Sequence, residues 1–222
     1  MKVKYNFDIK SVIFDMDGVI TDTMPYHYRA WRKIFSDAGV KMSRMDIYLR
    51  EGQSSAPCVK EIFALDQKAI SDKQVQQVLA QKEKLFKKIF KQRFILGARS
   101  FIRKLHAQGF QLGLVTGTAR HELLKILPKN LRNLFDVIIT GDEVSRGKPH
   151  PEPYQKALKV LKCKRSDAIV IENAPFGIQS AKAAGIYCLA IETSLPKKYL
   201  KKADQVFHSF KHLKNNVCLS KR

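Results

Sequence analysis

Carboxylates are scarce in this chain of 222 residues, in which 20 Asp and Glu stand against 41 Lys and Arg and the formal net charge is +21. Such a charge favours contact with nucleic acid, anionic membranes or small anionic substrates. The basic residues are spread over amphipathic segments such as KEKLFKKIFKQR (82–93), and they form no low-complexity arm. We therefore interpret them as a lysine-rich solvated surface and do not expect a nucleic-acid partner.

Cysteines and long apolar runs are also few. The four cysteines (Cys58, Cys163, Cys188 and Cys218) are scattered without a CxxC pair, which argues against a disulfide framework and indicates a reducing compartment. The histidines show no zinc-ligand spacing with them. No apolar run approaches the roughly 20 residues that cross a bilayer, and the first residues, MKVKYNFDIK, are too charged for a signal peptide. We expect a cytoplasmic monomer with no membrane contact.

Short apolar runs alternate with helical patterns along the rest of the chain. This order predicts an α/β fold, a Rossmann-like parallel sheet covered by helices on both faces. Helical periodicity is clear in ARSFIRKLHAQG (98–109) and PFGIQSAKAAG (175–185). The runs predicted to be strands are residues 11–15, 111–116, 136–140, 168–172 and 187–192.

One long interval interrupts this alternation. Residues 24–93 show helical periodicity throughout, whereas a crossover between parallel strands needs only about a dozen residues. The excess predicts an inserted α-helical cap domain at residues 23–93, with residues 1–22 and 94–222 forming the catalytic core. The tail after Phe207 is expected to be loosely packed.

The stretch FDMDGVITDT (14–23) places two carboxylates, Asp15 and Asp17, directly after the first predicted strand. Parallel sheets carry their chemistry at the carboxyl ends of their strands. A carboxylate can attack phosphorus to form an aspartyl-phosphate, and a second one can protonate the leaving group and then activate water. The alternative is that both residues only cap the turn that follows.

Three further loops supply groups suited to a phosphate and a cation. In TGTAR (116–120), Thr116 can donate to a phosphoryl oxygen, and the backbone N–H groups of Gly117 and Thr118 face an anion near a helix start, close to Arg120. In GKPHPEPY (147–154), prolines stiffen the loop that carries Lys148, a candidate phosphate clamp.

The third loop offers ligands for a hard cation. AIVIEN (168–173) ends a predicted strand with Glu172 and Asn173, whose oxygens suit Mg²⁺. With Asp15 and Asp17 they form the predicted metal site.

In order and spacing, DxDGVxxDT, hhTG, GKPxP and hhhE[DN]xxxGIxxAxxAG resemble the haloacid dehalogenase superfamily, in its β-phosphoglucomutase and phosphoglycolate-phosphatase-like branch. The resemblance spans nearly the whole chain. It implies Asp15 as nucleophile, Asp17 as acid and base, Thr116 and Lys148 on the phosphate, and Mg²⁺ as cofactor. It also implies substrate-binding positions at His27, Gly52 and Lys82, and a small phosphorylated metabolite as substrate.

Two positions depart from that pattern. In EGQSSAP (51–57), Ser55 stands where the mutases carry an arginine for the second phosphate of the substrate, so we favour a phosphatase over a sugar-phosphate mutase. Arg50 is a candidate substitute for that arginine. Asn173 stands where relatives carry aspartate, which removes a negative charge from the metal site. This leaves open a second alternative, an anion- or nucleic-acid-binding protein with weakened catalysis.

Overall fold

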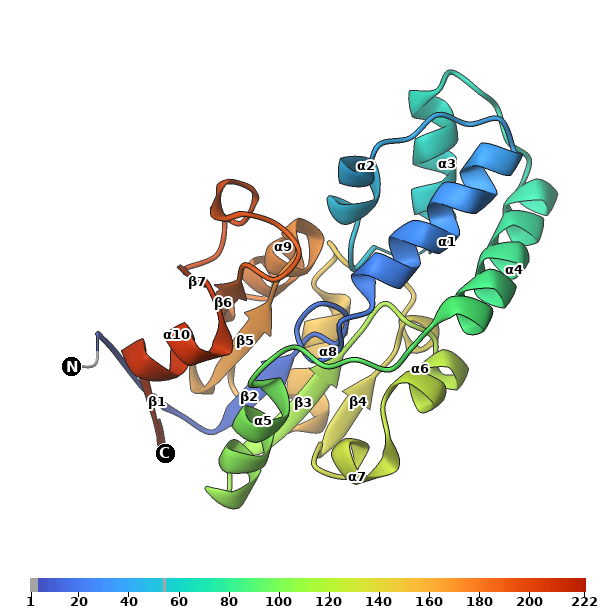
Figure 1. Cartoon of the computed structure of the whole chain (residues 1–222). Coiled ribbons are helices and arrows are strands. Elements are labelled where there is room, and N and C mark those ends of the chain that lie inside the picture. The colour runs from blue at the N-terminus through green and yellow to red at the C-terminus, as the bar shows by residue number, and fades with distance from the viewer. Residues whose placement is uncertain (1–3, 54) are drawn as a thin grey trace.

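A computed structural model describes residues 4–53 and 55–222. Its centre is a six-stranded parallel sheet in the order β4-β3-β2-β5-β6-β7 (Figure 1). The strands are β2 (Ser11–Phe14), β3 (Gln111–Val115), β4 (Val137–Ile139), β5 (Ala168–Glu172), β6 (Tyr187–Ile191) and β7 (Gln205–Phe207). The predicted α/β fold with a parallel sheet is confirmed.

Helices cover both faces of the sheet because its strands alternate their apolar side chains. In β2, Ile13 packs into one hydrophobic cluster, and Val12 and Phe14 pack into the other. The first cluster includes residues of α8 (Glu152–Val160) and α9 (Pro175–Ala183), and the second includes residues of α5 (Ala98–Ala107), α6 (Arg120–Ile126), α7 (Lys129–Arg132) and α10 (Phe210–Asn216). Short 3₁₀ turns occur at Gly141–Glu143, Arg165–Asp167 and Lys197–Tyr199.

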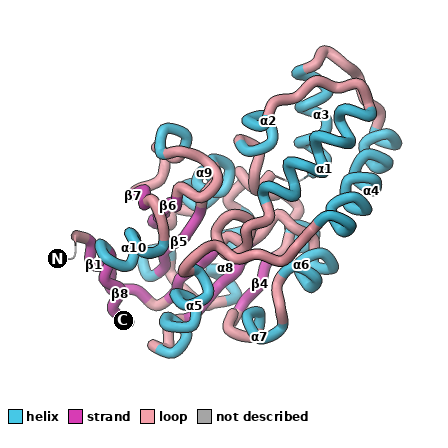
Figure 2. Tube along the Cα trace, viewed as in Figure 1, coloured by secondary structure: helices cyan, strands magenta, loops and turns pink. Residues whose placement is uncertain are grey.

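Four helices lie together beyond the carboxyl ends of the strands (Figures 1 and 2). They are α1 (Met24–Asp37), α2 (Arg44–Tyr48), α3 (Ser55–Leu65) and α4 (Asp72–Ile89). Helix α4 begins with a capping box between Ser71 and Gln74, and it buries Val75, Val78, Lys82 and Phe86 on one face. Two connecting segments join these helices to the rest of the chain. They lie side by side, since the Asp22 N–H donates to the Arg93 carbonyl at 3.0 Å.

The tail is ordered, contrary to the sequence expectation. Residues after Phe207 form α10 and then β8 (Val217–Lys221), which pairs in parallel with β1 (Tyr5–Ile9). Phe210 and Leu213 of α10 are buried in the core. Backbone pairing therefore holds strands β1 and β8 side by side (Figure 1).

Candidate active site

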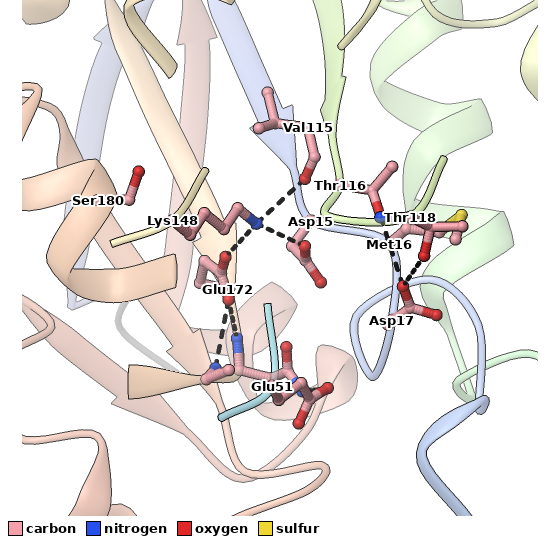
Figure 3. A network of polar contacts seen from close by, with 12 residues as sticks. Asp15, Met16, Asp17, Glu51, Val115, Thr116, Thr118, Lys148, Glu172 and Ser180 are labelled. Carbon is pink, nitrogen blue, oxygen red and sulfur yellow. Dashed lines mark hydrogen bonds and ion pairs between the residues drawn. The ribbon is translucent and has the colours of Figure 1, made fainter. Parts of the chain in front are cut away.

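The ends of three neighbouring strands bring the predicted catalytic residues together. Asp15 follows β2, Thr116 follows β3, and Glu172 ends β5. Because these strands are adjacent and parallel, their carboxyl ends lie along one edge of the sheet. The loop before α8 brings Lys148 to the same edge (Figure 3).

Lys148 joins two carboxylates in the interior. Its Nζ lies 2.6 Å from Asp15 Oδ1 and 2.7 Å from Glu172 Oε1, and it donates to the Val115 carbonyl at 3.1 Å. Burial acts to lower the pKa of Lys148, but the two carboxylates outweigh it and raise that pKa above its usual range, so the ammonium is charged. Burial raises the pKa of Asp15, which Lys148 opposes and Glu172 reinforces. The pKa of Asp15 lies well above its usual range as a result, and Lys148 is the group that opposes this rise.

Asp17 has different surroundings. Its Oδ2 accepts hydrogen bonds from Thr118 Oγ1 at 2.9 Å and Thr116 Oγ1 at 3.4 Å, and its Oδ1 accepts from Thr23 Oγ1 at 2.5 Å. Burial acts to raise the pKa of Asp17, but His27 and the hydroxyl donors outweigh it and lower the pKa to about 2. Asp15 is thus held by an ammonium, and Asp17 by His27 and by hydroxyl groups. Two carboxylates in such different settings are suited to different roles.

Glu172 already has partners for both of its oxygens. Oε1 accepts from Lys148 Nζ at 2.7 Å and from the Tyr154 hydroxyl at 2.9 Å, while Oε2 accepts from the backbone N–H groups of Asn173 at 2.9 Å and Ala174 at 3.2 Å. A Cβ at Gly177 would lie 1.6 Å from Glu172 Oε1, so only glycine fits there. The carboxylate of Glu172 therefore anchors Lys148, and its oxygens are less available to a cation than the prediction assumed.

Glu51 is a site residue that the sequence reasoning missed. It follows α2, and it is 5 % exposed among polar groups of the core. Its Oε1 accepts from Asn173 Nδ2 at 2.7 Å and from Ser194 Oγ at 3.4 Å, and Ser194 Oγ in turn accepts from Asn173 Nδ2 at 2.9 Å. The one available signal was an acidic residue directly before Gly52 in the predicted cap loop.

These residues fit a divalent cation. Within the described ranges, Glu51 Oε2 and Asn173 Oδ1 are buried oxygens without a hydrogen-bond partner. Burial raises the pKa of Glu51, and the charges of Asp15 and Asp17 add to that shift while Asn173 opposes it. A cation at this place would offset the mutual repulsion of these carboxylates, and oxygen ligands of this kind suit Mg²⁺.

A pocket of ≈ 170 Å³ lies between the strand ends and the four helices. The helical side closes over the core: Gln53 forms a parallel backbone bridge with Lys148, and Glu51 reaches Asn173. These contacts cover part of the strand ends and so restrict the access of bulk water to them.

Two ionisable side chains form part of the helical wall of the pocket. Lys82 is 7 % exposed, and its Nζ lies 5.4 Å from the Trp31 ring centroid and 5.1 Å from that of Phe86. Burial lowers the pKa of Lys82. The His27 ring stacks on Phe86 at 4.3 Å, and burial together with the charge of Lys82 lowers the pKa of His27, which favours a neutral ring at pH 7.

The structure places most of the predicted residues at the pocket and removes one of them. The predicted residues that line the pocket are Asp15, Asp17, His27, Gly52, Lys82, Gly117 and Thr118. Four others are hydrogen-bonded within the same polar network: Thr116, Lys148, Glu172 and Asn173. Arg120 does not line the pocket, contrary to its predicted role as a substrate-binding residue. Its guanidinium donates to the Ile138 carbonyl at 2.8 Å and to Glu143 at 2.6 Å, and these partners hold it away.

Ser55 and Arg50 both lie at the pocket wall. The Arg50 guanidinium already donates to Glu61 Oε2 at 2.8 Å and to the Asp46 carbonyl at 2.9 Å. These contacts leave Arg50 less able to bind the second phosphate of a substrate in place of the arginine expected in the mutases.

Comparison with known proteins agrees with this geometry. Residues 12–191 match the family described as haloacid dehalogenase-like hydrolase. The chain belongs to this family. The resemblance stated from the sequence motifs is thereby confirmed.

Individual relatives carry phosphatase and mutase names. The chain is 32% identical to the phosphorylated carbohydrates phosphatase of Thermotoga maritima over 80% of this chain and 82% of that protein. It is 27% identical to the β-phosphoglucomutase of Bacillus subtilis over 85% of each chain. The crystal structure of β-phosphoglucomutase from Clostridium difficile superposes with a TM-score of 0.81 and 26% identity, covering 92% of this chain and 93% of that one. Among the described residues, no helix is both long and apolar enough to cross a membrane.

Proposed function

We propose that this protein is a Mg²⁺-dependent phosphatase that hydrolyses small phosphomonoesters, such as sugar phosphates, through a phospho-aspartate at Asp15. The observation that carries the proposal is a buried carboxylate at a strand end that lies 2.6 Å from a buried ammonium and lines a pocket. A charge pair of this kind suits a nucleophile that meets an anionic phosphoryl group. The phosphatases among the relatives support the same reaction class.

In the first step, an Asp15 oxygen attacks phosphorus while the bond from phosphorus to the leaving oxygen breaks. Lys148 and Thr116 lie where they can neutralise and orient the phosphoryl oxygens. Asp17 gives its proton to the leaving alkoxide. Because the pKa of Asp17 is about 2 in this structure, the carboxylate must gain that proton when the substrate binds, and the negative charge of the phosphate acts in that direction.

In the second step, the Asp17 carboxylate takes a proton from water, and the resulting oxygen attacks phosphorus. The bond between phosphorus and Asp15 breaks, which releases inorganic phosphate and restores the carboxylate. Hydrogen bonds from Thr23 and Thr118 hold Asp17 beside the reacting centre through both steps.

Asp15, Glu51 and Asn173 are the residues that we expect to hold Mg²⁺, with Glu172 and Asp17 close by. The bound ion supplies positive charge that stabilises the phosphoryl oxygens. Residues 23–93 serve as a cap that opens to admit substrate and closes to exclude water. The crossings near Asp22 and Arg93 are the expected hinges.

A sugar-phosphate mutase is the second candidate. Lys82 favours it, because a buried ammonium on the helical wall suits a second phosphate. Ser55 disfavours it, since this side chain cannot grip a bisphosphate as an arginine does. Without that grip, we expect water to reach the phospho-aspartate before the intermediate turns around.

The test is phosphate release from a panel of phosphorylated metabolites with and without Mg²⁺. We expect metal-dependent phosphate release that Asp15→Asn abolishes and the matched control Asp37→Asn, an exposed carboxylate on α1, leaves intact. Conversion of a hexose 1-phosphate into the 6-phosphate without free phosphate would identify the mutase. No turnover with any substrate or metal would support the binding-protein alternative.

A further inference from the structure

Asn173 differs from an aspartate in one property that matters for a metal site. Its amide has two unlike ends, and only the oxygen end can hold a cation. A ligand asparagine therefore needs a device that fixes its orientation, whereas an aspartate does not.

The surrounding hydrogen bonds define that orientation. Asn173 Nδ2 faces two oxygens, Glu51 Oε1 at 2.7 Å and Ser194 Oγ at 2.9 Å, which use both amide protons. This leaves Oδ1 as the buried oxygen without a partner among the described residues. The network thus assigns the nitrogen to the side of Ser194 and Glu51, and the oxygen to the opposite side.

The two acceptors differ in the part of the chain that carries them. Glu51 belongs to the helical segment that we propose to move, whereas Ser194 follows β6 in the core. The neighbouring Thr193 fixes this loop, since its hydroxyl donates to the Gly18 carbonyl at 2.5 Å. A Cβ at Gly18 would lie 2.0 Å from Asn173 Nδ2 and 2.7 Å from Ser194 Oγ, so these groups pack tightly against the DxDG turn.

We propose that Ser194 is a positioning residue that holds the Asn173 amide with its oxygen toward the cation, including when the cap is open and Glu51 is withdrawn. The serine thereby fixes the orientation of an amide, which a carboxylate at this position would not need. This inference rests on the proposed function, because it requires that a divalent cation binds beside Asn173.

The test is titration of the substrate-free protein with Mn²⁺ alone. The signal of the free ion in electron paramagnetic resonance monitors the titration, so that affinity is measured without turnover. We expect Ser194→Ala to weaken Mn²⁺ binding about fivefold, which corresponds to roughly 1 kcal/mol, the net contribution of one hydrogen bond. Ser194→Thr keeps the hydroxyl and should bind like the native protein. Ser194→Gly deletes the hydroxyl by a second route and should match Ser194→Ala. Ser166→Ala, which removes a hydroxyl bonded to Asp167 in a distant turn, is the matched control.

Adding Ser194→Ala to Asn173→Asp distinguishes an effect on the orientation of the amide from a general loss of stability at the site. A carboxylate presents an oxygen in either orientation, so adding Ser194→Ala there should cost much less than it does with asparagine. Equal weakening in both backgrounds, or no weakening with asparagine, overturns the inference while leaving the proposed function intact. If the native protein binds no Mn²⁺, the proposed metal site itself is wrong and the inference falls with it.

Discussion

Glu51→Gln tests whether the cap loop contributes a metal ligand. The change keeps the size of the side chain and removes one negative charge from a group that is 5 % exposed and hydrogen-bonded to Asn173 at 2.7 Å. Two unit charges about 4 Å apart attract by about 4 kcal/mol at an effective dielectric near 20. If desolvation leaves about a third of this, the loss is about 1.4 kcal/mol, which is about tenfold in affinity.

The assay is isothermal titration with Mg²⁺, together with the Mg²⁺ concentration that gives half-maximal phosphate release. We expect both to shift about tenfold toward weaker binding in Glu51→Gln, and no shift in Asp37→Asn, which makes the same change of charge on the exposed surface of α1. An unchanged Mg²⁺ requirement in Glu51→Gln would refute the assignment of Glu51 as a ligand.

The contact between Glu51 and Asn173 sharpens this prediction. Asn173→Asp alone would place two carboxylates where an amide now donates at 2.7 Å, so part of the gain from an added charge is lost to repulsion. The double variant Glu51→Gln/Asn173→Asp exchanges the donor and the acceptor and preserves the net charge. We expect it to recover most of the Mg²⁺ affinity lost in Glu51→Gln. If it binds as weakly as Glu51→Gln, the charge is required specifically on the cap.

Three further outcomes are expected. Asp17→Asn should slow hydrolysis of alkyl phosphates far more than attack on p-nitrophenyl phosphate, whose leaving group needs no proton; equal losses in the two initial rates would argue against a general acid. Because the pKa of Asp17 is about 2 in the folded state against an ordinary 3.8, its stabilising contribution of about 2 kcal/mol is present above about pH 4 and is lost as pH falls toward 2. The free energy of unfolding, measured with urea, should therefore fall less between about pH 4 and pH 2 in Asp17→Asn than in the native protein. An equal fall in the two proteins would contradict this. Gly177→Ala should lower the thermal midpoint and weaken activity, since its Cβ would lie 1.6 Å from Glu172 Oε1; a midpoint and activity like those of the native protein would show that the helix shifts freely.

The sequence predicted the central strands because each one is a short apolar run that ends at a polar loop. Residues 11–15 and 168–172 correspond to β2 and β5, which are buried on both faces and therefore carry little polar sequence. Three strands were missed. Strand β7 has only three residues at the edge of the central sheet, and β1 and β8, YNFDI and VCLSK, mix polar and apolar residues in a peripheral two-stranded pair. The pairing of β1 with β8 joins the two ends of the chain, which local periodicity cannot reveal.

The same limit applies to the active site. Asp15, Thr116 and Lys148 could be predicted because each one follows a strand or stands in a stiff loop with a recognisable motif. The role of Glu51 depends on a contact with Asn173 across 122 positions of the sequence, and no local pattern encodes it. Arg120 was predicted from its place after TGT, but Glu143 and the Ile138 carbonyl, both distant in sequence, determine where its guanidinium lies.

The most direct test of the central claim is detection of the phosphoryl group on Asp15 itself. Asp17→Asn is mixed with p-nitrophenyl phosphate and Mg²⁺, quenched in acid within the first turnover, digested and analysed by mass spectrometry. Because the leaving group departs unaided while the removal of Asp17 slows attack by water, the account predicts one phosphoryl group on the peptide at Asp15, and none in the Asp15→Asn/Asp17→Asn double variant. Release of nitrophenol with an unmodified Asp15 peptide, or with the same yield when Asp15 is replaced, would contradict the account.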